Sequence, residues 1–360
     1  MERSSTGPVH ARVMTRPTQR SVVLMFPGTG AQHPRMAAGL YRREPVFTAA
    51  VDAVLGELGA EGEAVRADWL ADVPAVPLEA DARSAPLLFA VDYAVGRLVE
   101  SWGVRPAAYV GHSMGEFAAA TLAGVFRLED AVRLLWDRVE RQRATPVGGM
   151  TAVAAARYEV AGYLGAGVVV GAVNGPRHTV LSGPEAPLRA VEERLAADGR
   201  TFRRLATRTP YHSPALAPLV PGATALVAGM PLSAPRTLLY SAYTAGPLRE
   251  REALAPAFWA AQPTAQVLFW QTLDRVLRDD DRLLVEAGPS HSLSVLARSH
   301  PAVRSGRSTV AATLPPREQG PRADRLSLRA LRAWLRAEGA LPVPPGPGHS
   351  GTLPVELPLS

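Results

Sequence analysis

Short, almost wholly apolar runs occur at three widely separated places in the chain. They cover residues 22–26, 107–110 and 283–286. Strands of a parallel sheet are covered on both faces, so they appear in a sequence as continuous apolar runs rather than as alternating ones. The pattern therefore predicts one α/β body with a parallel sheet, formed by residues 21–149 and 210–315.

Residues 150–209, which lie between these two parts, have a different pattern of shorter segments. The order predicted is strand, helix, strand, strand, helix, strand. The six segments cover residues 151–155, 159–164, 167–173, 179–182, 187–197 and 201–205. This is the order of a ferredoxin-like unit, so we expect a small ferredoxin-like subdomain here.

The two ends of the chain differ from its middle. Residues 316–338 are expected to hold a C-terminal helix, because Leu326, Leu328, Leu331 and Leu335 give residues 326–337 an apolar face. Residues 339–360 are rich in Pro and Gly and should be irregular. Residues 1–20 are polar, lack the apolar core of a signal peptide and are expected to be disordered.

A serine stands at the centre of the sequence Gly111-His112-Ser113-Met114-Gly115-Glu116. The apolar run 107–110 precedes it and a helix-like stretch, residues 117–123, follows it. A serine at a sharp strand-to-helix turn, with a glycine on either side, is the nucleophile-elbow pattern. It indicates chemistry through an acyl-serine at Ser113, although a glycine-bounded turn can also carry a serine by chance.

The first apolar run ends in the loop Pro27-Gly28-Thr29-Gly30. Glycine-rich loops after a first strand can bind phosphate, but this spacing matches neither of the common phosphate-binding motifs and no Lys follows. The loop is better suited to offer a main-chain N–H to a developing oxyanion. Such a site needs two N–H groups, and we expect them from Met114, the residue after the serine, and from Thr29.

These motifs, taken together, resemble the acyl-carrier-protein transacylases. The resemblance rests on Phe-Pro-Gly-x-Gly-x-Gln at residues 26–32 and Gly-His-Ser-x-Gly-Glu at residues 111–116. It continues at Asn-Gly-Pro (174–176), Tyr-His-Ser-Pro (211–214) and Val-Glu-Ala-Gly-Pro (285–289). The family comprises malonyl-CoA:carrier-protein transacylases and the acyltransferase domains of polyketide synthases. It implies a hydrolase-like α/β core with the ferredoxin-like subdomain inserted and the active site in the cleft between them.

The resemblance also implies roles for individual residues. Ser113 matches the nucleophile and His212 the general base, whose imidazole is oriented by a main-chain carbonyl, here that of Gln262. Arg138 matches the arginine that holds the free carboxylate of malonyl-type substrates, although neighbouring arginines also lie on this segment. Other residues expected to line the substrate site are Tyr211, Asn174 and His112, the last as a structural residue and not as the base.

The acyl group itself is left open by the sequence. Thr29 replaces a usual Gln, Val139 replaces a usual Gly, and the four residues ending at His212 match neither the malonyl nor the methylmalonyl pattern of the family. The bulk of Tyr211 disfavours a branch at C2 of the acyl unit. The same changes are equally consistent with an unusual acyl group.

Composition limits the class of protein. The 360 residues are 47% hydrophobic, enough for a large core, and contain no apolar run long enough to cross a membrane. The absence of Cys excludes disulfides, thiolate metal sites and a cysteine nucleophile, and no His/Glu spacing suggests a metal. We therefore expect a cytoplasmic enzyme without a permanent cofactor.

Charge bears on the partner. The net charge is +6, and all 39 basic residues other than His are Arg. The arginines are dispersed without interleaved aromatic residues, so nucleic acid is not the expected partner. This charge would attract an acidic carrier protein or the phosphates of coenzyme A. The alternative is that the excess arginine only aids solubility.

The function expected is therefore acyl transfer from an acyl-CoA, most simply malonyl- or alkylmalonyl-CoA, through Ser113 to the phosphopantetheine thiol of an acyl carrier protein. We expect a free-standing, trans-acting monomer of polyketide or fatty-acid biosynthesis. Two alternatives remain open at this stage. The enzyme could move a larger acyl unit between two carriers, or it could hydrolyse acyl thioesters.

Overall fold

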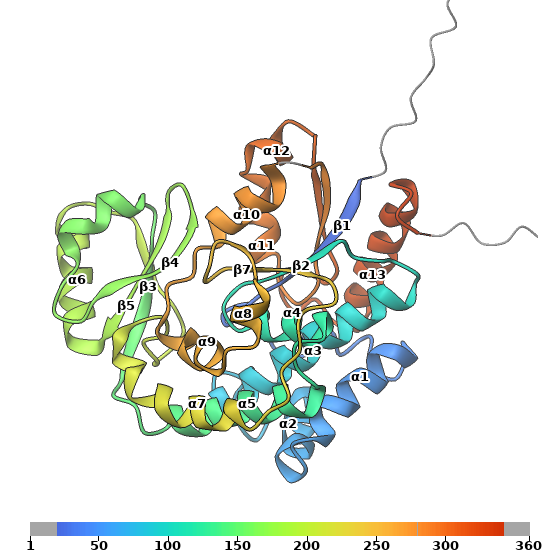
Figure 1. Ribbon diagram of the computed structural model, residues 1–360, viewed down its shortest axis with the longest axis horizontal. Helices are drawn as coiled ribbons and strands as arrows, with labels where there is room; N and C mark the ends of the chain where they lie inside the picture. The colour runs from blue at the N-terminus through green and yellow to red at the C-terminus, as the bar shows by residue number, and fades with distance from the viewer. Residues whose placement is uncertain (1–19, 279, 342–360) are drawn as a thin grey trace, which may run out of the picture.

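A computed structural model of the chain describes residues 20–278 and 280–341 (Figure 1). The segments expected to be irregular, 1–20 and 339–360, lie outside these ranges except for Arg20 and residues 339–341. Within the described residues there are two sheets, one mostly parallel and one antiparallel. Figure 1 shows the smaller sheet, with helix α6, on one side of the molecule and the larger sheet among the remaining helices.

The larger sheet has the strand order β10-β9-β1-β2-β7-β8. All its neighbours pair in parallel except β7 and β8, which are antiparallel. The strands are β1 (Ser21–Phe26), β2 (Ala108–Gly111), β7 (Leu238–Ser241), β8 (Gly246–Pro247), β9 (Arg282–Glu286) and β10 (Thr309–Ala312). The three predicted apolar runs thus form three adjacent central strands, β9, β1 and β2.

Side chains of β1 alternate between two helical layers, as the pleat of a strand requires. Val22, Leu24 and Phe26 belong to a core shared with helices α1 to α5 and α13. Val23 and Met25 belong to a second core shared with α10, α11 and α12. Both faces of the sheet are therefore covered, which explains why β1 shows no polar alternation.

The helices of the larger body include several short ones. The α-helices are α1 (Pro45–Gly56), α2 (Ala60–Leu70), α3 (Asp81–Ser101), α4 (Gly115–Ala123), α5 (Leu128–Gln142), α7 (Val220–Ala228), α8 (Glu250–Ala253), α9 (Pro256–Ala261), α10 (Phe269–Arg278), α11 (Ser292–Arg298), α12 (Pro301–Arg304) and α13 (Pro321–Ala337). Two 3₁₀ helices, η2 (Pro214–Leu219) and η3 (Gln262–Thr264), lie beside the candidate site.

The smaller sheet is antiparallel, with the strand order β4-β5-β3-β6. Its elements are β3 (Gly148–Val153), the 3₁₀ helix η1 (Arg157–Tyr163), β4 (Val169–Gly175), β5 (His178–Pro184), α6 (Glu185–Ala197) and β6 (Phe202–Arg204). Its core is separate from the two cores of the larger sheet. Main-chain hydrogen bonds from Val173 to Val267, and from Val267 to Gly171, join β4 to the segment before α10.

The expected α/β fold class, with a parallel-sheet core and a second small sheet, is confirmed by this architecture. Differences concern the ends and types of single elements. The first helix of the small subdomain is a 3₁₀ helix. Strand β3 begins at Gly148, three residues before the predicted start, because Gly148 and Gly149 pair with the end of β5. Helix α13 starts five residues before the amphipathic stretch, at Pro321, since proline is well tolerated in a first turn.

Within the described residues, none of the helices combines the length and the apolar character needed to span a bilayer.

Candidate active site

Ser113 stands in a sharply strained turn between β2 and α4. Its φ is 53°, a left-handed value that is rare for residues other than glycine. The two flanking glycines leave no room for a side chain. A Cβ on Gly111 would lie 2.1 Å from Cα of Glu116, and one on Gly115 would lie 2.2 Å from the carbonyl oxygen of Phe26. The predicted elbow is therefore built by close backbone approach, with strain concentrated at the serine.

His212 reaches this serine from the loop that follows the small sheet. Ser113 Oγ lies 2.7 Å from His212 Nε2, although the two residues are 99 positions apart in the chain. The main-chain N–H of His212 donates to the carbonyl of Pro263 at 2.6 Å, and its φ is 62°. The structure thus brings together the two residues that the resemblance pairs.

Two main-chain carbonyls hold the other side of the His212 ring. Nδ1 lies 3.2 Å from the carbonyl oxygen of Gln262 and 2.9 Å from that of Ala265. Carbonyl oxygens only accept hydrogen bonds, so the proton must be on Nδ1, which leaves the Nε2 lone pair for the Ser113 hydroxyl. The expected carbonyl of Gln262 is present, but Ala265, which the sequence did not indicate, is the nearer acceptor.

Burial sets the charge of this imidazole. His212 is 4% exposed, and burial, followed by the charge of neighbouring His112, lowers its pKa to about 3. The ring is therefore neutral at physiological pH and can accept a proton from the serine.

The loop after β1 lies directly against the elbow. A Cβ on Gly28 would lie 2.4 Å from the carbonyl oxygen of His112 and 3.0 Å from Cβ of Ser113, so only glycine permits this approach. Thr29 and Met114 line the same cavity as Ser113. Within residues 20–278 and 280–341, no group accepts a hydrogen bond from the main-chain N–H of either Thr29 or Met114. Both N–H groups are thus available to an oxyanion.

Arg138 enters this narrow cavity from α5. Its guanidinium carbon lies 4.5 Å from the centre of the Phe117 ring, and Nη2 donates to the carbonyl of Trp259 at 3.3 Å. No carboxylate in the described part of the chain pairs with it. Burial lowers the pKa of Arg138, yet an arginine with so high an ordinary pKa keeps its charge. The cavity beside Ser113 therefore contains an unpaired positive charge.

Tyr211 and Gln142 form the polar wall next to this arginine. The Tyr211 hydroxyl donates to Gln142 Oε1 at 2.9 Å, and both side chains line the cavity with Ser113. The Tyr211 ring lies 6.4 Å from that of His212. The expected place of Tyr211 in the substrate site fits this geometry, whereas Gln142 had no assigned role in the sequence.

His112 and Asn174 bind to each other instead of facing the cavity. His112 Nε2 lies 2.8 Å from Asn174 Oδ1, and the imidazole packs edge-on against Phe269 at 5.4 Å. Neither residue lines the cavity that contains Ser113. The pair connects the elbow to β4 of the small sheet, which is consistent with a structural part for His112.

Tyr243 is a site residue that sequence reasoning missed. Its phenol lies near the Ser113 side chain, and its pKa is raised by burial and by the nearby Glu116 carboxylate. The Tyr243 ring lies 6.0 Å from that of His212. It follows β7 as a single aromatic residue in a loop, and nothing in the local pattern marks it.

Glu116, the last residue of the elbow motif, is fully buried beneath the site. Its carboxylate accepts the main-chain N–H of Ala242 at 3.0 Å and lies 3.5 Å from Nε2 of Gln262, the residue whose carbonyl holds His212. Burial raises the pKa of Glu116 to about 8. The carboxyl group therefore holds a proton at neutral pH and links the elbow helix to the loop that supports the base.

This gives a prediction for stability against pH. Glu116 binds its proton more tightly in the folded than in the unfolded chain. Its contribution to the free energy of unfolding is therefore complete below pH 4.5 and is lost as the pH rises through about 8. Glu116→Gln keeps an acceptor for Ala242 but cannot ionise. We expect the variant to gain free energy of unfolding relative to the natural protein between pH 6 and 9, measured by urea unfolding.

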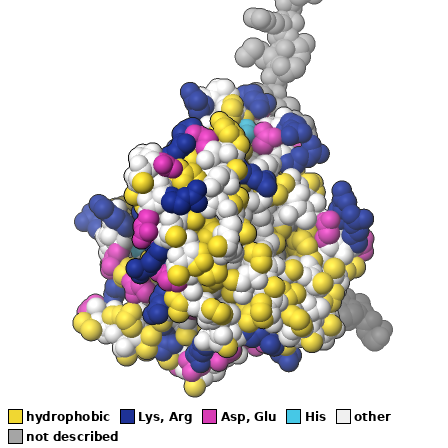
Figure 2. Space-filling view, turned by 90° about the vertical axis from the view of Figure 1, so that its left-hand side faces the viewer, with side chains coloured by type: hydrophobic (Ala, Val, Ile, Leu, Met, Phe, Trp, Pro, Cys, Tyr) yellow, Lys and Arg dark blue, Asp and Glu magenta, His cyan; other side chains and the backbone are white. Residues whose placement is uncertain are grey.

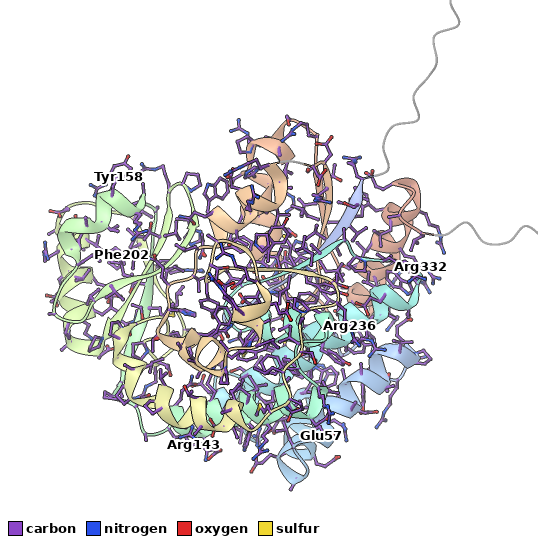
Figure 3. All side chains as sticks on the ribbon, in the orientation of Figure 1. Glu57, Arg143, Tyr158, Phe202, Arg236 and Arg332 are labelled. Atoms are coloured by element: carbon purple, nitrogen blue, oxygen red, sulfur yellow. The ribbon has the colours of Figure 1, made fainter. Side chains whose placement is uncertain are left out.

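The control is Glu57→Gln, an exposed position that Figure 3 shows at the lower edge of the molecule, away from the small sheet. It should follow the natural protein at every pH. Parallel stability curves for Glu116→Gln and the natural protein across this range would show that Glu116 does not titrate in this way.

A second, wider cavity borders His212 from the side of the small sheet. It is lined by Arg157, Tyr158, Ala161, Leu164, Val169, Val170, Pro214, Thr264 and Gln266 as well as by His212. Tyr158 is 80% exposed at its rim, and Figure 3 shows this side chain at the outer edge of the small subdomain. His212 therefore lines both cavities, whereas Ser113 lines the narrow inner one.

Comparison with known proteins identifies the family. Residues 23–333 match the model of the acyl transferase domain. The chain is 38% identical over 300 residues to a phenolphthiocerol/phthiocerol polyketide synthase of Mycobacterium tuberculosis, covering 83% of this chain and 20% of that protein. It is 36% identical over 282 residues to polyketide synthase GfsB of Streptomyces halstedii, covering 77% of this chain and 5% of the relative.

Solved structures agree with these relatives. The acyltransferase domain from the second module of the salinomycin polyketide synthase has a TM-score of 0.80 at 33% identity, covering 90% of this chain and 75% of that one. The acyl transferase domain of SpnD, in complex with 2-(pent-4-yn-1-yl)malonyl, has a TM-score of 0.83 at 29% identity, with coverages of 91% and 79%. The chain therefore belongs to the acyl transferase domain family.

Proposed function

We propose that this chain transfers an acyl group from a thioester donor to the phosphopantetheine thiol of an acyl carrier protein. The observation that carries the proposal is the 2.7 Å contact between Ser113 Oγ and a neutral, buried His212 that lines both cavities. A hydroxyl bonded to a positioned, unprotonated imidazole is an activated nucleophile.

The first half-reaction forms an acyl-serine. As Ser113 Oγ attacks the thioester carbonyl carbon, its proton passes to Nε2 of His212, and the carbonyl oxygen becomes an oxyanion. The free N–H groups of Thr29 and Met114 are placed to stabilise that charge. When the C–S bond breaks, His212 returns the proton to the departing thiolate. The carbonyls of Gln262 and Ala265 stabilise the imidazolium that exists in between.

The second half-reaction reverses these steps with a new thiol. The carrier's phosphopantetheine thiol gives its proton to His212 and attacks the acyl-serine carbonyl, and Ser113 leaves with the proton restored. Neither half-reaction needs a metal or a redox partner, because every bond broken and every proton moved is accounted for by the serine, the histidine and the thiols. The single serine serves both thiols in turn, which is a ping-pong route.

The inner cavity favours an acyl group with a free carboxylate. Arg138 points into it without a carboxylate partner from the described residues, and the planar guanidinium fork binds a carboxylate in bidentate fashion. Malonyl or a short alkylmalonyl unit therefore suits this cavity better than a neutral acyl chain. The relative SpnD holds a malonyl derivative in its acyl transferase domain, which is consistent with this choice.

The outer cavity suits the pantetheine arm of either thioester. It reaches from His212 to the exposed rim at Tyr158, so a thioester carbonyl at Ser113 would have its sulfur and arm directed outward. Figure 2 shows the face on this side of the molecule, where dark blue arginine and magenta acidic side chains lie among hydrophobic ones. Such a face is compatible with an acidic carrier protein. Complementary charge would speed the association of the two proteins.

The test combines acylation and transfer. Intact-protein mass would be measured after mixing with malonyl-, methylmalonyl-, ethylmalonyl- and acetyl-CoA in turn, and the labelled protein would then be offered a carrier protein bearing phosphopantetheine. We expect a mass gain from a dicarboxylic donor, followed by its appearance on the carrier. Release of free acid in place of transfer would indicate a hydrolase. No gain from any CoA ester, but gain from an acyl-carrier donor, would indicate transfer between carriers.

A further inference from the structure

Gln142 is a buried amide at the end of α5, one helical turn beyond Arg138. It is 7% exposed and lines the cavity that contains Ser113. Its Oε1 accepts a hydrogen bond from the Tyr211 hydroxyl at 2.9 Å. Its Nε2, which carries two N–H donors, is buried and has no partner among the described residues.

An unpartnered donor at this depth needs an explanation. Buried polar groups are nearly always hydrogen-bonded, because leaving one unpaired forfeits the bonds it made to water. Turning the amide over does not remove the problem. The Tyr211 hydroxyl would satisfy the nitrogen, and the oxygen would then lack a partner. A polar group on a ligand in the cavity would give the Gln142 amide its missing hydrogen-bond partner.

The surroundings of Gln142 restrict what that group can be. Leu135, Val139 and Met114 make much of the cavity wall apolar, and Arg138 supplies its only charge among the described lining residues. Residues four apart on a helix are neighbours on one face, so Gln142 lies beside the group that Arg138 binds. A ligand carboxylate would occupy the guanidinium fork, leaving the amide N–H for a different atom attached close to it.

We propose that Gln142 contacts the acyl group and donates an N–H to an oxygen substituent at C2, so that the enzyme prefers a malonyl unit with a C2 hydroxyl or ether over one with a C2 alkyl group. The inference rests on the proposed acyl transfer and names the acyl unit more closely. An alkyl substituent of the same size would cover the amide without pairing it. Recognition of that kind rejects the analogue that lacks the acceptor.

The test compares two donors that differ only in hydroxyl against methyl, 2-hydroxymalonyl-CoA and methylmalonyl-CoA, with malonyl-CoA as reference. The measured quantity is kcat/KM for acylation of Ser113, followed by intact mass. We expect the natural protein to favour the hydroxyl donor roughly tenfold, the factor typical of a single buried hydrogen bond. Gln142→Leu should abolish or reverse that preference, which is read as the ratio of the rates with the hydroxyl and methyl donors.

Two further variants separate a lost contact from a damaged fold. Gln142→Met places a flexible apolar side chain at the same position and should behave like Gln142→Leu. Arg143→Gln alters the adjacent exposed residue at the end of the same helix (Figure 3) and should retain the natural preference.

Several results would overturn the inference. Equal kcat/KM for the two donors in the natural protein would do so. An equal loss for all three donors in Gln142→Leu would do so too, because the amide would then bind the shared carboxylate. If no donor acylates Ser113, the proposed function fails as well. Acylation by malonyl-CoA without any C2 preference overturns this inference alone.

Discussion

Ser113→Ala protein is expected to gain no mass from any acyl-CoA under conditions in which the natural protein is fully acylated. The substitution removes the hydroxyl oxygen that lies 2.7 Å from His212 Nε2 and leaves the imidazole, both oxyanion N–H groups and Arg138 in place. Loss of the nucleophile of such a pair typically costs at least about 10⁴-fold in rate. Steady-state transfer to a carrier protein should fall by a comparable factor.

Alanine at position 113 should not damage the fold. The strained φ of 53° becomes no harder to adopt, and the side chain lost is small. Circular dichroism and thermal unfolding should therefore match those of the natural protein. His212→Ala provides a second comparison, since it keeps the nucleophile but removes its base and should be acylated very slowly. Acylation of Ser113→Ala at the natural rate would place the nucleophile elsewhere in the chain.

The residues that sequence reasoning located are those marked by local patterns. The elbow at Ser113 is specified by glycines two positions away on each side, and the loop at Thr29 by its proline and glycines. The order of elements in the small sheet follows from the six short segments between residues 151 and 205. In each case the physical requirement lies within a few neighbouring positions, where a single sequence can display it.

The contacts that sequence reasoning missed join residues far apart in the chain. Ala265 accepts from His212 across 53 positions, the Glu116 carboxylate receives the N–H of Ala242 across 126, and Tyr211 reaches Gln142 across 69. Neither a main-chain carbonyl nor a lone glutamine has a signature in composition or periodicity. Only the fold shows which of many such groups are buried together, and therefore which ones act on the serine, the base or the acyl group.

Arg138→Ala is expected to lower kcat/KM for malonyl-CoA by roughly 100- to 1,000-fold, which corresponds to about 3–4 kcal/mol for the loss of two charge-assisted hydrogen bonds. Acetyl-CoA has no carboxylate, so its own slow acylation should change little or improve as the cavity widens. The ratio of the two rates, measured by intact mass at short times, is the readout, because it cancels any general loss of active protein.

The guanidinium also packs on Phe117 and bonds the carbonyl of Trp259, so the alanine variant loses structural contacts as well. Arg138→Lys separates the two effects. Lysine keeps the charge but has no planar fork, and we expect it to recover part of the malonyl rate with a raised KM. A fall of equal size for malonyl- and acetyl-CoA in both variants would show that Arg138 supports the elbow through Phe117 and not the carboxylate. The unpaired charge in the cavity would then have no part in choosing the acyl group, and selection would fall to the polar wall formed by Tyr211 and Gln142.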